Sequence, residues 1–385
     1  MAIETGIDRL IREKSGAKAK GRGRIALATN PSAVTGRGVP TWKALMDSGF
    51  SLAAFFGPEH GFRGDAQDAV EIADGSFRGI PSYSLYGARL EPEERMLKDI
   101  DLVVYDIQDV GCRYYTYLYT LANIARVCER LGLPLLVLDR PDPIGGAEVE
   151  GGPIADSAAG FVGGYRLPPR YGMTVGEFAR YLQGEFFPGL RLEVEGLGGW
   201  DRRDLFDRAG LPWVSPSPNI PSLATALVYP GTCLFEGTNV SEGRGSTRPF
   251  ETVGAPWIDG EELREELASL ALPGLVFAPA AFTPNASKHS GAFCGGVSIT
   301  VTEPEKFKPL LTGLALLKTI HDKYRESFEW KATWEDSQVF FVDRLAGGKE
   351  LRLWIGEGLP LEEIYARLSR GREDFLARRR LYLLY

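Results

Sequence analysis

An acidic residue and a histidine stand directly after an apolar segment near the start of the chain. The stretch FGPEHGFRGD at residues 56–65 places Glu59 and His60, one of only three histidines, at the end of the apolar run LAAFFG. A carboxyl group at the exit of a buried strand is partly removed from water, which raises its pKa and suits it to general acid catalysis. We therefore expect Glu59 to be a catalytic acid that His60 orients. An ordinary N-cap or surface position is the alternative for Glu59.

Three other apolar runs end in polar side chains in the same manner. They are RIALAT, DLVVYDI and PLLVLD, at residues 24–29, 101–107 and 134–139. The carboxyl ends of parallel strands lie along one edge of a sheet, where ligands bind. We expect Glu59 to share this edge with the polar residues at the other strand ends, which are Asn30, Asp106, Gln108, Asp109, Asp139 and Arg140. Asp106 and Asp109 are candidates for a second catalytic carboxylate, and the others are candidates for substrate binding.

Two further segments concentrate groups that bind hydroxyls and carboxylates. DIQDVGCRYYTYLYT at residues 106–120 adds Arg113 and several tyrosines, some of which pack in the core while others, Tyr117 among them, suit a sugar-binding face. The glycine-broken stretch 233–250 is either a solvated surface loop or part of a site for a polyhydroxyl ligand. Its candidates are the carboxylates Glu236 and Glu242 and the binding residues Thr238, Asn239, Ser241 and Arg244.

Composition and missing motifs exclude several classes of function. A net charge of −7 gives no support for a nucleic-acid partner, and four scattered cysteines with no C-x-x-C pair argue against a zinc site. Neither a G-x-G-x-x-G fingerprint nor a phosphate loop is present, which disfavours a nucleotide cofactor, and G-x-S-x-G is absent. Three dispersed histidines make a histidine metal site improbable, although carboxylate-bound Mg²⁺ stays open. We expect no cofactor, and the surplus of carboxylates is typical of glycosidases.

The elements that must position these residues indicate an α/β fold. The apolar runs are continuous rather than alternating, as in a parallel sheet covered on both faces, and helical patterns such as residues 116–132 lie between them. We predict a Rossmann-like open parallel sheet domain over residues 1–255. From residue 256 a capped helix at 259–270 and an alternating strand at 295–302 predict a second, smaller α/β domain over 256–385.

The sequence also bears on location. Its first residues are charged, and no stretch approaches the roughly 18 apolar residues of a membrane span. We therefore expect no membrane association and a cytoplasmic protein as the sequence stands, or a periplasmic or secreted one if an export signal has been removed. The sequence does not indicate an oligomeric state.

The order of motifs resembles one bacterial family over nearly the whole chain, from about residue 24 to the end. The motifs are TNPSA, FGPEHGFRGD, YSLYG, DLVVYDIQDVGCRYYTY, VLDRPDPIGG, PSPNIPS, YPGTCLFEGTNVSEGRGSTRPFE and GAPW. They are similar to those of the NamZ-type exo-β-N-acetylmuramidases, formerly a domain of unknown function. Asp142 in DRPDP departs from the family's usual Asn. Family members often carry an export signal, and we expect this sequence to depart from the family in that respect.

The resemblance implies hydrolysis of a terminal, non-reducing N-acetylmuramic acid (MurNAc) from peptidoglycan fragments, in a cleft between a Rossmann-like domain and a smaller α/β domain. It places the family's proposed catalytic glutamate at Glu59. The second catalytic group is then Asp106, Asp109, Glu236, Glu242 or the substrate's own 2-acetamido group. An arginine, which is Arg63, Arg113 or Arg244, is expected to bind the lactyl carboxylate. The alternative function is a non-catalytic muropeptide- or sugar-binding protein that uses the same cleft.

Overall fold

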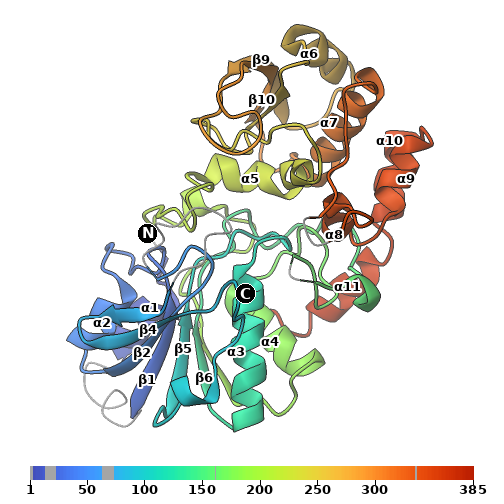
Figure 1. Ribbon diagram of the computed structural model, residues 1–385. Helices are drawn as coiled ribbons and strands as arrows, with labels where there is room; N and C mark the ends of the chain where they lie inside the picture. Colours follow the sequence, from blue (N-terminus) through green and yellow to red (C-terminus); the bar gives the residue numbers. More distant parts are fainter. Residues whose placement is uncertain (1–2, 14–22, 63–72, 161, 334–335) are drawn as a thin grey trace.

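The chain folds into two lobes that lie one above the other in Figure 1. The computed structural model describes residues 3–13, 23–62, 73–160, 162–333 and 336–385. The lower lobe in Figure 1 holds a seven-stranded sheet, and the upper lobe holds a three-stranded sheet with its own helices. This arrangement confirms the predicted α/β class with a second, smaller domain.

The large sheet has the strand order β3-β4-β2-β1-β5-β6-β7. All neighbouring pairs are parallel except β3 with β4. Strand β1 lies between β2 and β5. The chain therefore builds the sheet outward from β1 on one side with β2 and on the other side from β5 onward, as in Rossmann-like folds. The strands are β1 (Arg24–Thr29), β2 (Ser51–Gly57), β3 (Gly75–Phe77), β4 (Ile80–Ser84), β5 (Leu102–Asp106), β6 (Leu135–Leu138) and β7 (Leu192–Glu195).

Helices cover both faces of this sheet, as its continuous apolar runs predict. Alternate strand residues such as Ile25 and Leu27 pack with α1 (Gly6–Glu13) and α2 (Thr41–Asp47) on one face. Residues between them, such as Ala26, pack on the other face with α3 (Tyr117–Leu131) and α4 (Val175–Glu185). Every residue of β5 and β6 is buried, which removes apolar surface from water on both faces and stabilises the lobe.

The second lobe is built on the antiparallel order β8-β10-β9. Its α5 packs on α7, and α6 lies against β9 and β10. Both α5 and β8 contact elements of this lobe, although they lie before residue 256, where the second domain is expected to begin. The elements are α5 (Leu223–Thr232), β8 (Thr252–Ala255), α6 (Gly260–Ser269), β9 (Leu275–Phe282), β10 (Cys294–Val301) and α7 (Pro309–Lys323).

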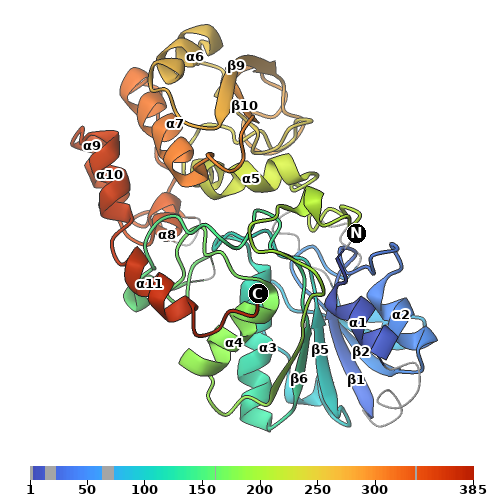
Figure 2. The ribbon, with the colours of Figure 1, turned by 180° about the vertical axis from the view of Figure 1, so that it is seen from behind.

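The last helices lead the chain from the second lobe back to the first. Both views place α11 and the C-terminus beside the first lobe (Figures 1 and 2). Arg379 in α11 donates to the backbone carbonyls of Gly146 and Gly172, at 2.9 and 2.5 Å. In the described part of the chain no helix is long and apolar enough to cross a bilayer. The returning helices are α8 (Phe341–Ala346), α9 (Glu350–Gly356), α10 (Leu361–Leu368) and α11 (Arg372–Arg379).

Candidate active site

A tight turn after β2 positions Glu59. The backbone N–H of Gly61 donates to the Pro58 carbonyl at 2.9 Å, which closes the turn. His60 and Gly61 both have positive φ, of 68° and 76°. Glycine adopts this conformation at little cost, but for a histidine it is strained, and such strain is concentrated at functional sites. The turn leaves Glu59 half-buried and buries His60.

Hydroxyl groups from two other elements contact the Glu59 carboxylate. The Thr116 hydroxyl, at the N-cap of α3, donates to Oε2 of Glu59 at 2.6 Å. Tyr86, which follows β4, is also hydrogen-bonded to Glu59; burial, and then the Glu59 charge, raise the pKa of this phenol. The turn after β2, the end of β4 and the start of α3 therefore converge on one carboxyl group.

The second lobe contributes two carboxylates joined by an arginine. Glu236 lies in the short 3₁₀ helix Cys233–Gly237 that follows α5, and Glu242 and Arg244 lie in the loop after it. Arg244 Nη2 donates to Glu236 Oε1 at 2.7 Å, and its Nε lies 3.2 Å from Glu242 Oε1. Glu242 is only 2% exposed, so this segment buries its charged side chains and is not a solvated surface loop.

The charges of the two lobes act on one another. Burial, and next the charge of Glu242, raise the pKa of Glu236 to about 8, and the charge of Glu59 acts in the same direction. The charge of Lys288 opposes this shift, because a nearby cation favours the ionised carboxylate. Burial lowers the pKa of Arg244 to about 10, and Glu59 counteracts that change. Glu59, Glu236 and Arg244 therefore form one electrostatic unit.

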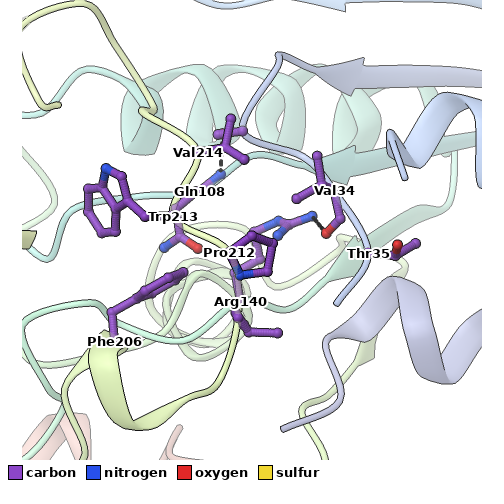
Figure 3. A pocket seen from close by; sticks show the side chains of 10 residues that line it. Val34, Thr35, Gln108, Arg140, Phe206, Pro212, Trp213 and Val214 are labelled. Carbon is purple, nitrogen blue, oxygen red and sulfur yellow. Dashed lines mark hydrogen bonds between the residues drawn. The ribbon is translucent and has the colours of Figure 1, made fainter. Parts of the chain in front are cut away.

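Two of the other polar strand ends form a buried ion pair. Arg140 contacts both oxygens of Asp106, at 2.5 and 3.1 Å, and Thr41 donates to Asp106 at 2.5 Å. Arg140 also donates to the Val34 carbonyl at 2.9 Å, as Figure 3 shows. The contacts of Asp106 and Arg140 tie β5 and β6 to the segment after β1, so these side chains stabilise the sheet edge rather than face Glu59.

A small pocket lies at this edge, between the ends of β1, β5 and β6 and the segment 206–214. Gln108 and Arg140 line it together with the aromatic rings of Phe206 and Trp213 (Figure 3). The side-chain amide of Gln108 donates to the carbonyls of Asp109 and Pro141, at 2.8 and 2.9 Å. The polar groups of the pocket are thus engaged in holding the loops around it.

Asn30 and Asp139 also bond to neighbouring segments. The amide of Asn30 donates to the Pro216 carbonyl at 3.1 Å, and its oxygen accepts from Ser32. Asp139 accepts four hydrogen bonds, at 2.7–2.9 Å, from the backbone N–H groups of Arg140 and Gly176 and the hydroxyls of Thr174 and Tyr385. The polar strand ends that were expected to form one rim therefore hold loops in place, whereas Glu59 is hydrogen-bonded to Thr116 and Tyr86.

Asp109 and Asp142 are buried carboxyl groups behind the site. Burial raises the pKa of Asp109 to about 7, against the hydrogen bonds from Tyr171 and the Gly111 N–H. Burial also raises the pKa of Asp142, which accepts from the Ile144 N–H at 3.1 Å.

The side chains of Arg113 and Tyr117 donate hydrogen bonds to backbone carbonyls of other segments. Arg113 is 1% exposed and donates to the carbonyls of Leu167 and Leu345, so it joins the first lobe to α8. Tyr117 donates to the Pro216 carbonyl at 2.6 Å. Burial raises the pKa of the Tyr117 phenol, and the charge of Glu59 adds to this rise. Arg63 lies outside the described residues.

The remaining candidates, Thr238, Asn239 and Ser241, shape the loop that carries Arg244. Thr238 donates to the Phe235 carbonyl at 2.9 Å, and Ser241 accepts from the Gly243 N–H at 3.1 Å. Asn239 bridges to residues 327 and 329 through its side-chain amide. Their contacts fix the geometry of the second-lobe carboxylates.

Three residues of the site were not predicted from the sequence: Tyr86, Thr116 and Lys288. Tyr86 lies in the motif YSLYG, and Thr116 lies within the tyrosine-rich stretch, so their segments were singled out while the residues were not. Lys288 donates to Glu242 at 2.8 Å from the loop between β9 and β10. No pattern near Lys288 signals this contact, because it depends on how the hairpin packs on a loop more than 40 residues earlier.

The chemistry of this site and the fold around it define a class of enzyme. Two lobes bring carboxyl groups together with hydroxyl and cationic donors, which is the equipment of a glycoside hydrolase. Family models for the N-terminal and C-terminal parts of exo-beta-N-acetylmuramidase NamZ match residues 25–224 and 227–385. The chain belongs to the NamZ family of exo-β-N-acetylmuramidases, which confirms the resemblance inferred from its motifs.

Relatives and solved structures agree with this assignment. The chain is 44% identical over 388 residues to the peptidoglycan beta-N-acetylmuramidase NamZ of Bacillus subtilis (strain 168), covering 100% of this chain and 91% of the relative. Two crystal structures of DUF1343 family proteins from Bacteroides fragilis NCTC 9343 share the fold, with TM-scores of 0.89 and 0.77 at 32% and 28% identity. Each alignment covers 100% of this chain and 99% of the other.

Proposed function

We propose that this chain releases terminal non-reducing MurNAc from peptidoglycan fragments, with Glu59 as the general acid and Glu236 as the second catalytic carboxylate. Family membership and the B. subtilis relative, which is named a peptidoglycan beta-N-acetylmuramidase, support the substrate. The observation that carries the residue assignment is the different setting of the two carboxyl groups, Glu59 against the Thr116 hydroxyl and Glu236 against a guanidinium; the Glu59 charge, which acts on Glu236 across the lobes, supports it.

The proposed reaction is a hydrolysis in which each bond and proton is accounted for. The Glu59 carboxyl group gives its proton to the glycosidic oxygen as the bond from that oxygen to C1 of MurNAc breaks. A water oxygen forms the new bond to C1, and its proton passes to the Glu236 carboxylate. Glu236 also stabilises the positive charge that develops on the sugar ring in the transition state.

The surroundings of the two carboxyl groups support these roles. Glu59 is hydrogen-bonded to two neutral hydroxyls, those of Thr116 and Tyr86. A hydroxyl can accept as well as donate a hydrogen bond, so these partners accommodate a protonated carboxyl group. Glu236 is held by the Arg244 guanidinium, which favours its ionised form. Burial strengthens Glu236 as a base, because a general base works best when its pKa lies near the working pH.

Arg244 is the described arginine that best suits the lactyl carboxylate of MurNAc. It lies beside Glu236, the charge of Glu59 acts on it, and its side chain is 17% exposed, whereas Arg113 is 1% exposed. A planar guanidinium recognises a carboxylate through paired hydrogen bonds. This group distinguishes MurNAc from N-acetylglucosamine, so Arg244 would supply selectivity.

Leaving-group dependence tests the role of Glu59. The variant Glu59→Gln is assayed on a MurNAc-terminated disaccharide and on 4-nitrophenyl β-N-acetylmuraminide, whose leaving group needs little protonation. We expect a loss of about 100-fold or more on the disaccharide and a much smaller loss on the nitrophenyl substrate. Glu185→Gln, which changes a partly buried glutamate of α4, is the control. Equal losses on both substrates would assign the acid role elsewhere.

The alternative function, a non-catalytic sugar-binding protein, predicts a different outcome. Wild-type protein would then bind MurNAc derivatives saturably and release no product from either substrate. The cytoplasmic location expected from the sequence as it stands stays a prediction.

A further inference from the structure

We propose that Lys288 is a positioning residue of the active site, which fixes Glu242 and through it Arg244 and Glu236. The proposal rests on the proposed function, and it assigns a role to a segment of the second lobe, the loop 283–293 between β9 and β10. Lys288 contacts none of the reacting groups proposed above; it acts on the loop that carries them.

The ammonium group of Lys288 has its full set of hydrogen-bond partners. Its Nζ donates to the carbonyls of Phe235 and Val240, at 2.6 and 3.0 Å, and to Oε2 of Glu242 at 2.8 Å. A lysine ammonium carries three protons, so these three acceptors saturate it. The two carbonyls lie on either side of the 236–239 turn, so Lys288 holds the turn and the carboxylate in one arrangement.

The contacts continue from Lys288 to the proposed catalytic carboxylate. Glu242 is 2% exposed, and its second oxygen lies 3.2 Å from Nε of Arg244. The same guanidinium donates to Glu236 at 2.7 Å. Opposite charges therefore alternate along the chain Lys288–Glu242–Arg244–Glu236, and without Lys288 the buried Glu242 carboxylate would compete with Glu236 for Arg244.

The backbone around Lys288 is shaped to make this contact. Ser287 and His289, on either side of Lys288, have positive φ of 64° and 57°. Residues other than glycine adopt this conformation at a cost in conformational energy, and the surrounding contacts must maintain it. His289 Nε2 lies 2.7 Å from the Asn239 carbonyl, and the Asn285 N–H donates to the Gly245 carbonyl at 2.9 Å.

The close approach at Gly245 shows how tightly the two loops pack. A Cβ atom at this position would lie 2.5 Å from the backbone nitrogen of Ala286, and the φ of Gly245 is 78°. The loop 283–293 is thus hydrogen-bonded to both ends of the Asn239–Gly245 segment, and Lys288 contacts the segment between these two ends. A lysine present only for solubility would need none of these constraints.

The experiment compares Lys288→Met with Lys318→Met as a matched control. Lys318 is 18% exposed against 21% for Lys288, lies in α7 of the same lobe, and pairs with Asp322 away from the site. Turnover of 4-nitrophenyl β-N-acetylmuraminide is measured across pH, together with the thermal unfolding midpoint. We expect kcat of Lys288→Met to fall by about 10- to 100-fold because the reacting groups are misplaced, while Lys318→Met retains wild-type kcat.

The pH profile separates positioning from a general loss of stability. The charged or titratable groups that act on Glu236 are Glu242, Lys288, Glu59, Cys233, Arg244 and Tyr229. Because the Lys288 charge lowers the pKa of Glu236, its removal should move the rising limb of the rate to higher pH. Lys288→Arg keeps the charge but not the three-point contact, so we expect its limb to stay in place while kcat falls.

Each outcome bears on the proposal. Wild-type kcat and an unmoved pH limb in Lys288→Met would overturn it. If Lys288→Met does not fold, full activity in Lys288→Arg would overturn it, and reduced kcat with an unmoved limb would support it. Absence of turnover in the wild-type protein would refute the proposed function itself and this role with it.

Discussion

At the scale of single residues, the difference between Glu59 and Glu236 comes from their contacts. Glu59 meets the hydroxyls of Thr116 and Tyr86, whereas Glu236 meets a guanidinium and lies near a second carboxylate. Two carboxyl groups in different surroundings can divide the roles of acid and base between them. The order of their protonation is therefore the property to measure.

The rate should rise with pH toward the pKa of Glu236. A base must be ionised to accept a proton, and the pKa of Glu236 is raised to about 8, so kcat should increase as the pH rises toward 8. Glu242→Gln removes a neighbouring negative charge and should move this limb to lower pH. A rate that falls as pH rises through 8 would instead make Glu236 the proton donor.

At the scale of elements, the sequence predicts the strands and helices closely. The run at 24–29 is β1 in full, and the helical pattern at 116–132 corresponds to α3 with Gly132 as its C-cap. These elements follow from local patterns of apolar residues and from a glycine at the point where the backbone must turn left-handed.

Gly132 gives a direct test of that local reasoning. Its φ is 65° and an added Cβ would meet no atom within 4 Å, so Gly132→Ala changes only the backbone preference. We expect a loss of about 1 kcal/mol in the free energy of unfolding, measured in urea. Gly356→Ala in α9, which also meets no neighbour and has no positive φ, should be neutral or slightly stabilising. Equal effects of the two substitutions would contradict this explanation.

The site was less predictable than the elements. Glu59 and the segment 233–250 were found because acids and glycines stand out after apolar runs. The partners of Asp106, Asp109 and Asp139 come from other strand ends, from Tyr171 and from the C-terminal Tyr385, and no local pattern announces such contacts. A polar strand end therefore indicates an edge of the sheet, but the packing of loops decides whether it faces a ligand.

At the scale of the whole molecule, the C-terminal segment ties the second lobe to the first. The Tyr385 hydroxyl donates to Asp139 Oδ2 at 2.7 Å and accepts from the Leu197 N–H at 2.6 Å. Asp139 is fully buried at the end of β6. The end of the chain thus completes the hydrogen bonds of a carboxyl group in the first lobe.

Removal of the Tyr385 hydroxyl should weaken the whole molecule. Tyr385→Phe leaves a buried N–H without its acceptor and a buried carboxyl group with one donor fewer, which should cost about 1–3 kcal/mol of unfolding free energy. Tyr382→Phe is the control, because the Tyr382 hydroxyl donates to the more exposed Glu185. A smaller loss for Tyr385→Phe than for Tyr382→Phe in denaturant unfolding would contradict this role of the Tyr385 hydroxyl in anchoring the C-terminal segment to the first lobe.

Cleavage of MurNAc from a glycan through Glu59 can be measured directly. Wild-type protein and Glu59→Gln are incubated with a disaccharide of MurNAc β-linked to N-acetylglucosamine, and the released sugars are identified by mass. We predict free MurNAc from the wild-type protein and release at least about 100-fold slower from the folded variant. Release of MurNAc by Glu59→Gln at the wild-type rate would contradict the account.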